Sequence, residues 1–412
     1  MNSSAPRSSR RRWPVRRQAL VFWAVALLVL SPVYRYIGVR LVSESALPLA
    51  AAVLAWSLLA LHMAMVPASF VTSRLTRPSK AVDVFHWATY LGMGFLALVL
   101  PMLAVRDLAE VAWRVLADPV AHARVASAAI SGDASALVAT RLGNLAIIVV
   151  SLVATTSGVT AARRVARVKR VTVPIAGLPA SLAGYRIVQI TDVHVGPTIK
   201  GDYVRRIVDE VNALDPHLVV LTGDLVDGSV ANLREHTRPL ADVAARDGRF
   251  YVTGNHEYYS GAEAWVREVA RLGFTPLVNE HRLLEIEGGA RVLVAGVTDV
   301  HAGRAVRGHR CDPEAALRDA PPADVTVFLA HQPNTARHAA RLGAHLHVSG
   351  HTHGGQFFPW HLPVRLSTPY VAGLYRVGAM WLYVSRGTGY WGPPMRLGAP
   401  SEITLLELAR AD

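Results

Sequence analysis

The sequence predicts an α/β domain that follows an all-helical membrane region of about four helices. In the C-terminal part, short β-branched apolar runs alternate with polar clusters and helical patterns. Such runs are typical of strands buried on both faces of a sheet. In the first 170 residues, four apolar stretches approach or exceed the length needed to cross a bilayer, which is roughly 20 residues.

The charge pattern of the membrane region predicts its orientation. The apolar stretches cover about residues 18–34, 47–71, 84–105 and 142–161. Fourteen basic residues flank one side and six flank the other. By the positive-inside rule both termini face the cytoplasm. We therefore expect a multi-pass cell-membrane protein with a cytoplasmic C-terminal domain.

An alternative topology follows from the start of the chain. Arg16 and Arg17 precede an apolar stretch that Pro32 and Arg35 shorten, and this arrangement resembles a twin-arginine export signal. If the first stretch were cleaved or failed to insert, the C-terminal domain would lie outside the cytoplasm. The lack of a typical cleavage site and the three further stretches favour the cytoplasmic placement.

Composition divides the chain into four parts. We expect a basic disordered tail at 1–17, a membrane region at 18–162, a basic juxtamembrane linker at 163–180 and the α/β domain at 181–412. Within the membrane region, residues 106–130 mix charged and apolar residues at helical spacing. They fit either an interfacial helix or a solvated loop helix, and we expect the latter.

The net charge of +13 belongs to the membrane part. Residues 1–170 hold 20 basic and 6 acidic side chains, whereas residues 171–412 hold 23 and 24. The basic residues therefore predict contact with anionic lipid headgroups of the bilayer, and no nucleic-acid surface is expected on the domain. The single Cys311 excludes an intramolecular disulfide, which fits a reducing compartment.

Five polar clusters follow the predicted strands of the domain. The strands are 185–190, 218–222, 250–253, 325–330 and 346–349, and the clusters are Asp192-Val-His194, Gly223-Asp224, Gly254-Asn255-His256-Glu257, His331 and Gly350-His351-Thr352-His353. If each strand ends where its cluster begins, the clusters gather at one sheet edge. Carboxylate, imidazole and amide ligands suit Mn, Fe, Zn or Mg. Each cluster alone fits a structural histidine or a turn, but their ordered set favours a metal site.

The order D-x-H, G-D, G-N-H-E, H, G-H-x-H resembles the calcineurin-like metallophosphoesterase superfamily over roughly residues 180–408. Gly354-Gly355-Gln356, 385–389, 394–396 and 400–403 resemble its membrane-associated bacterial branch. The resemblance implies a four-layer αββα sandwich of two mixed sheets. Helical patterns at 203–214, 262–272 and 333–341, and final strands near 381–385 and 402–408, agree with that architecture.

The resemblance also implies a ligand set for two divalent metal ions, which are Mn, Fe, Zn or Mg. One ion would be held by Asp192, His194 and His353, the other by Asn255, His331 and His351, with Asp224 bridging both. Two cations about 3.5–4 Å apart polarise one shared water and clamp phosphate oxygens. His256 is the expected catalytic residue, which protonates or stabilises the leaving oxygen.

Other residues near the clusters have two interpretations each. Asp227 and Glu257 either orient the ligand histidines or occupy turns, and Arg386 and Arg396 either meet a substrate phosphate or pair with carboxylates. Asp299 is expected near the site. A further set has structural roles or lines a substrate wall: His217, His345 and His347 as structural histidines, and Phe357, Phe358, Trp360, Tyr390 and Trp391 as core or wall aromatics.

The expected function is that of a membrane-anchored, metal-dependent phosphoester hydrolase. It would cleave a phosphoester or pyrophosphate bond by direct water attack, with manganese as a candidate metal and phosphodiesters among the candidate substrates. The membrane tether favours a lipid-linked substrate. The alternative is a noncatalytic membrane scaffold or sensor that keeps the fold; it predicts eroded metal ligands, and none of the motif positions is eroded.

Overall fold

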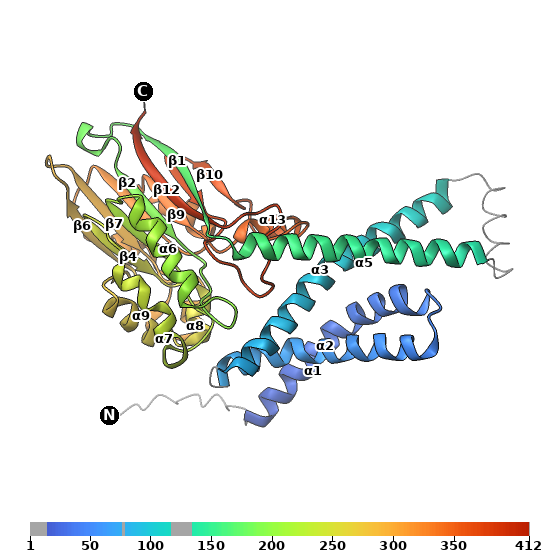
Figure 1. The fold of residues 1–412 in the computed structure, drawn as a ribbon. Coiled ribbons are helices and arrows are strands. Elements are labelled where there is room, and N and C mark those ends of the chain that lie inside the picture. The colour runs from blue at the N-terminus through green and yellow to red at the C-terminus, as the bar shows by residue number, and fades with distance from the viewer. Residues whose placement is uncertain (1–14, 76–78, 117–133, 412) are drawn as a thin grey trace, which may run out of the picture. The chain divides into compact units, whose positions relative to one another are not determined.

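The computed structural model describes residues 15–75, 79–116 and 134–411. Its N-terminal part consists of long helices, each long and apolar enough to cross a membrane (Figure 1). They are α1 (Val15–Gly38), which continues into a π-helical turn (Val39–Ser43), α2 (Leu49–Leu75), α3 (Lys80–Leu116) and α5 (Ala134–Arg163). These helices contain the four predicted apolar stretches. The predictions for residues 1–14 and 117–133 lie outside the described residues.

The described residues form two compact units, and α2, α3 and α5 contribute to both. The first unit lies within Met1–Phe70 and Val99–Ile148, and the second lies within Val71–Leu98 and Val149–Asp412. The second unit therefore joins segments of the apolar helices to the α/β domain. The four segment boundaries expected from composition stay a prediction.

Charged side chains of the first unit pair with one another. Arg40 Nε lies 2.9 Å from Asp107 Oδ2, and the Tyr36 hydroxyl donates to the same oxygen at 2.6 Å. Arg106 Nη1 donates to Asn144 Oδ1 at 2.6 Å. Because unpaired charges in apolar surroundings are costly, this pairing lets apolar helices carry ionisable residues.

Two six-stranded sheets form the α/β domain in the second unit. Their orders are β1-β12-β2-β3-β4-β5 and β10-β11-β9-β8-β7-β6. The strands of the first are β1 (Arg167–Ile175), β2 (Arg186–Ile190), β3 (Leu218–Thr222), β4 (Gly248–Val252), β5 (Thr275–Pro276) and β12 (Glu402–Arg410). Those of the second are β6 (Glu280–Glu285), β7 (Arg291–Gly296), β8 (Val325–Leu329), β9 (Leu346–Ser349), β10 (Gly373–Val377) and β11 (Met380–Val384).

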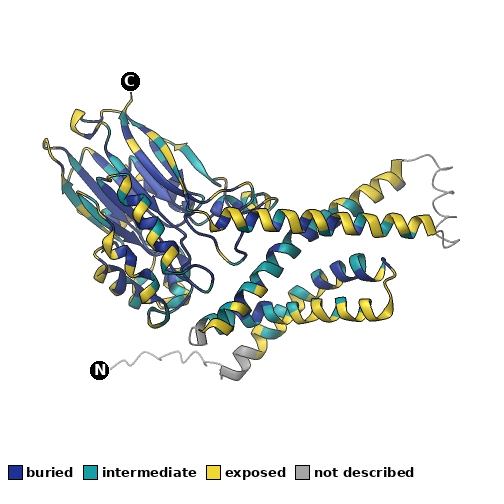
Figure 2. Cartoon of the chain, viewed as in Figure 1, coloured by how far each residue is buried: buried dark blue, intermediate teal, exposed yellow. Residues whose placement is uncertain are grey.

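The packing of these sheets confirms the expected four-layer αββα sandwich. Val220 of β3 and Val294 of β7 are fully buried in the cluster between the sheets. Helices α6 (Gly201–Ala213), α7 (Val230–Thr237) and α9 (Ala262–Arg271) cover the outer face of the first sheet, and α11 (Pro313–Leu317) and α12 (Ala336–Arg341) cover that of the second. Burial is highest along the strands, and the outer faces of the helices are exposed (Figure 2). Short helices α8 (Asn255–Ser260), α10 (Ala302–Ala305) and α13 (His361–Ser367) lie in loops.

The expected linker at 163–180 contains a strand. β1 pairs in parallel with β12 from Arg167 opposite Glu402 to Ile175 opposite Arg410. Its residues alternate irregularly between exposed and buried positions, and its basic residues hide the strand pattern in the sequence. The first strand of the first sheet therefore begins only a few residues after α5 ends at Arg163.

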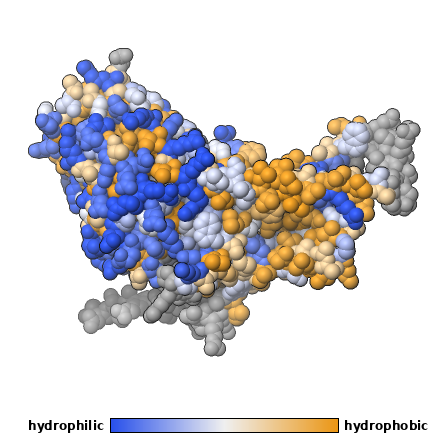
Figure 3. All heavy atoms as spheres, in the orientation of Figure 1, coloured by the Kyte–Doolittle hydropathy of each residue, from blue (hydrophilic) through white to orange (hydrophobic). Residues whose placement is uncertain are grey.

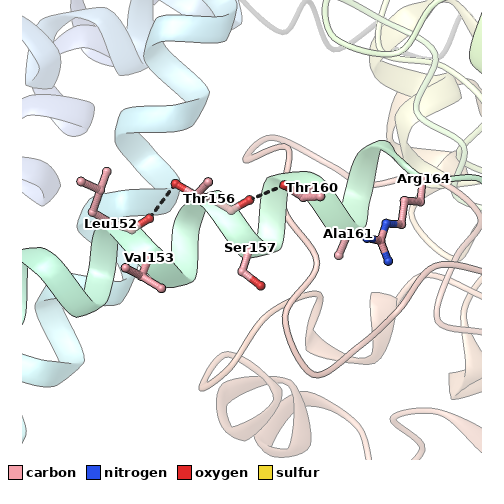
Figure 4. Close-up of a pocket in the computed structure, with 7 residues that line it drawn as sticks. All are labelled: Leu152, Val153, Thr156, Ser157, Thr160, Ala161 and Arg164. Carbon is pink, nitrogen blue, oxygen red and sulfur yellow. Dashed lines mark hydrogen bonds between the residues drawn. The ribbon is translucent and has the colours of Figure 1, made fainter.

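The surfaces of the two kinds of structure differ in polarity. Apolar residues dominate the faces of the long helices, whereas hydrophilic residues dominate the face of the α/β domain (Figure 3). One side of α5 forms a shallow recess of mixed polarity near its C-terminal end (Figure 4). There the hydroxyls of Thr156 and Thr160 each donate to a carbonyl of the helix itself, Leu152 O and Thr156 O, both at 2.9 Å. The threonines are thus compatible with apolar surroundings.

A buried glutamine joins the two sheets below the ends of the strands, and its loss should lower stability. Gln189 Nε2 donates to Thr222 Oγ1 at 2.7 Å and to Ser349 O at 2.9 Å. We expect Gln189→Ala to lower the free energy of unfolding by about 1–3 kcal/mol, because buried acceptors lose their donor. Urea unfolding of the full chain in detergent, followed by fluorescence, measures this.

A matched control is Asn212→Ala, whose side chain also makes two hydrogen bonds: it donates to Asp242 O and accepts from the Ala244 N–H, both at 2.8 Å. Both bonds are exposed and water replaces them, so the loss there should stay well below that of the buried glutamine. Equal effects of the two substitutions would contradict a role for burial.

Candidate metal centre

The five polar clusters converge where the strands end. His194 Nε2 lies 3.1 Å from His353 Nε2, and His353 Nε2 lies 3.4 Å from Asp192 Oδ1. In a second group, His331 Nε2 lies 3.1 Å from His351 Nδ1. These residues follow β2, β8 and β9, so both sheets contribute. The structure thus brings together the side chains that the sequence placed 20 or more residues apart, in two groups that each could hold a cation.

Asp224, directly after β3, lies between the two groups. Its Oδ2 is 3.1 Å from His331 Nε2 and 3.9 Å from His194 Nε2, and the residue is 2% exposed. Burial alone would raise its pKa, but the neighbouring histidines, His331 first, hold that pKa well below its usual range. A buried carboxylate that stays ionised and faces both groups has the position that a bridging ligand requires.

The side chain of Asn255 indicates most directly that a cation fits this centre. It begins α8, and its side-chain Oδ1 is buried with no hydrogen-bond partner among the described residues. A buried carbonyl oxygen without a partner is costly, unless a cation takes that role. Amide oxygen, carboxylate and imidazole together form a donor set for hard-to-borderline divalent metals, so the residues fit the implied ions.

The backbone at these positions is strained. Five of the seven expected ligands have left-handed φ angles: Asp192 (52°), His194 (54°), Asp224 (51°), His351 (73°) and His353 (51°). Such angles are uncommon outside glycine and cost of the order of 1 kcal/mol or more each. Gly254 is needed for a different reason, because a Cβ there would lie only 2.5 Å from the backbone nitrogen of Asp224.

His256 and Asp227 form a pair at the edge of the centre. His256 Nδ1 lies 2.6 Å from Asp227 Oδ1, which is also 3.1 Å from His194 Nδ1. Burial lowers the pKa of His256, but Asp224 and Asp227 outweigh it and raise the pKa to about 9. His256 Nε2 points toward the centre, 3.9 Å from Asp224 Oδ2. Asp227 thus contacts and orients two histidines, which is the first of the two roles considered for it.

Of the two roles considered for Glu257, the contacts favour the one in a turn. Its carboxylate accepts from the backbone N–H groups of Gly254 (2.6 Å), Leu225 (2.7 Å) and Asp224 (3.0 Å). Burial and Asp224 raise its pKa to about 7, against the effect of these donors. Its function is to fix the turn that presents Asp224 and to join that turn to the start of α8.

The two candidate arginines are already paired within the protein. Arg386 Nη1 donates to the buried Glu402 Oε2 at 3.1 Å. Arg396 is 2% exposed; it donates to carbonyls of neighbouring loops, and its Nη2 lies 3.1 Å from His353 Nδ1. Burial, followed by the charge of Arg396, holds the pKa of His353 well below its usual range, which keeps this imidazole neutral as a metal ligand must be.

The loop that carries Arg396 packs against the apolar helices, and the sequence did not reveal this contact. The backbone N–H of Arg396 donates to Gly158 O of α5 at 2.9 Å. Met395 fits between two helix glycines: a Cβ on Gly94 of α3 would lie 2.5 Å from Met395 Sδ, and one on Gly158 would lie 3.1 Å from Met395 Cβ. The isolated glycines in apolar stretches were the available signal. The helices therefore support His353 through Arg396.

Aromatic side chains divide between core and surface. Phe357 and Tyr390 are buried, whereas Phe358, Trp360 and Trp391 are at least partly exposed. Trp391 lies edge-on to His256 with ring centroids 5.5 Å apart, and Tyr259, which the sequence did not single out, does so at 5.4 Å. These two exposed rings flank the candidate catalytic histidine.

The remaining candidates have structural roles. His217 accepts from the Arg186 N–H and His345 from the Thr326 N–H, while His347 is buried beside Thr335. Asp299 accepts from Gln332 Nε2 at 2.8 Å, next to the expected ligand His331. The structural assignment of the three histidines agrees with these contacts.

The chain is similar to a known protein family and to several known proteins. The family model described as calcineurin-like phosphoesterase matches residues 185–355. A Bos taurus protein named "Transmembrane protein with metallophosphoesterase domain" is 36% identical over 85% of this chain and 80% of its own length. A Danio rerio protein of the same name is 39% identical over 65% of this chain and 62% of its own. A Helicobacter pylori protein named "Uncharacterized metallophosphoesterase" is 40% identical over 54% of this chain and 59% of its own.

A larger side chain at position 158 should disturb the contacts by which Met395 and Arg396 position His353. We expect Gly158→Leu to displace Met395 and Arg396 and to weaken Mn²⁺ binding about 10- to 100-fold, the usual effect of losing a residue that orients a metal ligand. Titration of the metal-depleted full chain with Mn²⁺ measures this. Gly143→Leu is the matched control in the same helix, because a Cβ there meets nothing within 4 Å. Equal Mn²⁺ affinities of the two variants would contradict the claim that the helices position His353 through Arg396.

Proposed function

Because this chain belongs to the calcineurin-like metallophosphoesterase family and is a metal-dependent phosphoric ester hydrolase, we propose that its domain holds two divalent cations. This is the domain linked to the apolar helices. We propose as ligands of one ion Asp192, His194 and His353, and as ligands of the other Asn255, His331 and His351, with Asp224 shared. The observation that carries this proposal is the buried Asn255 Oδ1, which has no hydrogen-bond partner among the described residues.

The cations would supply Lewis acidity toward the phosphoryl oxygens and a water activated for attack. The protein's own part is to orient and to transfer a proton. Asp227 Oδ1 engages His256 Nδ1 at 2.6 Å and leaves Nε2 directed toward the centre. Against the effect of burial, Asp224 and Asp227 raise the pKa of His256, and this favours a proton on that nitrogen. His256 then donates it to the leaving oxygen, and attack by water needs no covalent enzyme intermediate.

A lipid-borne substrate is the finer part of the proposal. Helices α3 and α5, which extend through both units, are long and apolar enough to cross a membrane. They contact the loop beside His353 through Gly94 and Gly158. The exposed rings of Tyr259 and Trp391 flank His256 and offer apolar contact to the part of a substrate that leaves. The excess of basic residues on one side of the helices supports a multi-pass topology with this domain in the cytoplasm.

Removal of the proposed acid tests the reaction. With the full chain in detergent and Mn²⁺, we expect His256→Ala to lower kcat about 100- to 10,000-fold while bound Mn²⁺ stays unchanged. Rates on a chromogenic phosphodiester and the matching monoester, together with metal analysis, measure both effects. The control is His281→Ala on β6, whose ring Nδ1 lies 2.9 Å from Ala316 O, and this variant should keep its rate.

The same assay separates the alternatives. Asp224→Asn should abolish both metal binding and turnover, because the shared carboxylate is lost. A phosphoester lipid in mixed micelles that is cleaved faster than its water-soluble headgroup analogue would support the lipid-borne substrate, and the reverse order would oppose it. Two bound metals with no turnover on any phosphoester would favour the noncatalytic scaffold.

A further inference from the structure

We infer that the recess between α13 and the β10–β11 hairpin, whose lining contains none of the expected metal ligands, binds the anionic headgroup of a membrane lipid. The recess has a volume of about 300 Å³, which is at the lower end of ligand sites. Its lining includes His361, Arg365 and Arg386 and no acidic residue. A cavity with this charge selects an anion.

The charges of the lining are not equally available. Arg386 shares its Nη1 with Glu402, so part of its charge is compensated. Arg365 lies exposed on α13 and makes no hydrogen bond or ion pair with any residue in the described part of the chain. A guanidinium with all five donors available forms bidentate bonds with a phosphate. Arg365 is therefore the principal anion ligand.

Three exposed apolar side chains, here called the apolar rim, belong to the same segment as Arg365. Phe358 is 60% exposed, Leu362 is 54% exposed and Leu366 is 92% exposed. The three are spaced four residues apart, and the two leucines share one face of α13. Exposed apolar side chains next to a basic residue are typical of segments that enter the boundary between headgroups and acyl chains. The rim therefore suits the chains of the same lipid whose headgroup fills the recess.

A contact with α3 connects this segment to an apolar helix. Trp360 Nε1 donates to Ala97 O of α3 at 3.2 Å. Within the helix that carbonyl would accept from the residue four positions later, which is Pro101 and has no N–H. The indole thus supplies the missing donor, which apolar surroundings make necessary. Nearby, Phe357 packs with Leu98 of the same helix.

These observations together favour a lipid over a free anion. A site for a soluble phosphate needs the basic lining but gains nothing from the exposed leucines or from attachment to a candidate membrane span. The segment Phe358–Leu366 offers all three features within nine residues. Occupancy of the recess does not require the metal centre, so this inference is independent of the proposed hydrolysis.

The test measures lipid binding by the full chain in a nonionic detergent, after EDTA treatment removes any phosphate binding by metal ions. The probe is dihexanoylphosphatidic acid, followed by calorimetry. Dihexanoylphosphatidylcholine has the same chains without net negative charge, and inorganic phosphate has the anion without chains. We expect saturable binding of the phosphatidic acid and at least 10-fold weaker binding of the other two.

Variants place the binding in the recess. Arg365→Gln should weaken phosphatidic acid binding about 10-fold or more, since charge-assisted bonds to phosphate are lost. Arg337→Gln, which removes an exposed arginine of α12 outside the recess, should leave it unchanged. Leu366→Gln should weaken binding severalfold through the lost apolar contact. All three side chains are exposed, and melting temperatures confirm that the variants are folded.

Each contrary result overturns a stated part of the inference. Equal binding by Arg365→Gln and the unaltered protein would remove the recess as the site. Equal binding of the phosphatidylcholine would show that charge is not recognised. Inorganic phosphate bound as tightly as phosphatidic acid would identify a soluble-anion site and exclude the lipid.

Discussion

The structure of this domain depends on one buried carboxylate, that of Asp224. It is held between imidazoles of both sheets and remains ionised because they compensate the loss of water around it. Its position is set by the turn after β3, whose N–H groups bind Glu257, and by the absence of a side chain at Gly254. Left-handed backbone at Asp192 and His353 is tolerated because the surrounding strands determine these turns from both sides.

The long helices contribute to the site as well as to membrane attachment. Met395 lies against glycines of α3 and α5, and the next residue, Arg396, reaches His353 from a fully buried position. A chain of contacts therefore leads from apolar helices to an expected metal ligand. Rigid packing of this kind transmits small displacements, because buried side chains have no free volume into which they can relax. A domain separated from its helices would lose one wall of this support.

Polar groups in apolar surroundings are satisfied by different means in different parts of the chain. Thr156 and Thr160 return their hydroxyls to carbonyls of α5, whereas the carbonyl left without a donor by Pro101 is bound by Trp360 from the α/β domain. The first solution is local, and the second requires the domain to be present. Catalysis and lipid contact would thus share one structural unit, with Trp360 and Arg396 as separate connections to the helices.

The sequence by itself determined the fold class, the apolar helices and the set of residues that converge, since strand runs and motif order are local patterns. It could not reveal β1, whose basic residues read as a linker and whose strand exists only because β12 lies beside it. It also left Arg396 open between substrate contact and ion pairing, and Glu257 between orienting histidines and occupying a turn. Only the tertiary structure decided these points, because burial and hydrogen-bond partners depend on segments far apart in the chain. For the same reason the exposed Arg365 and its recess became visible only once α13 and the β10–β11 hairpin were placed together.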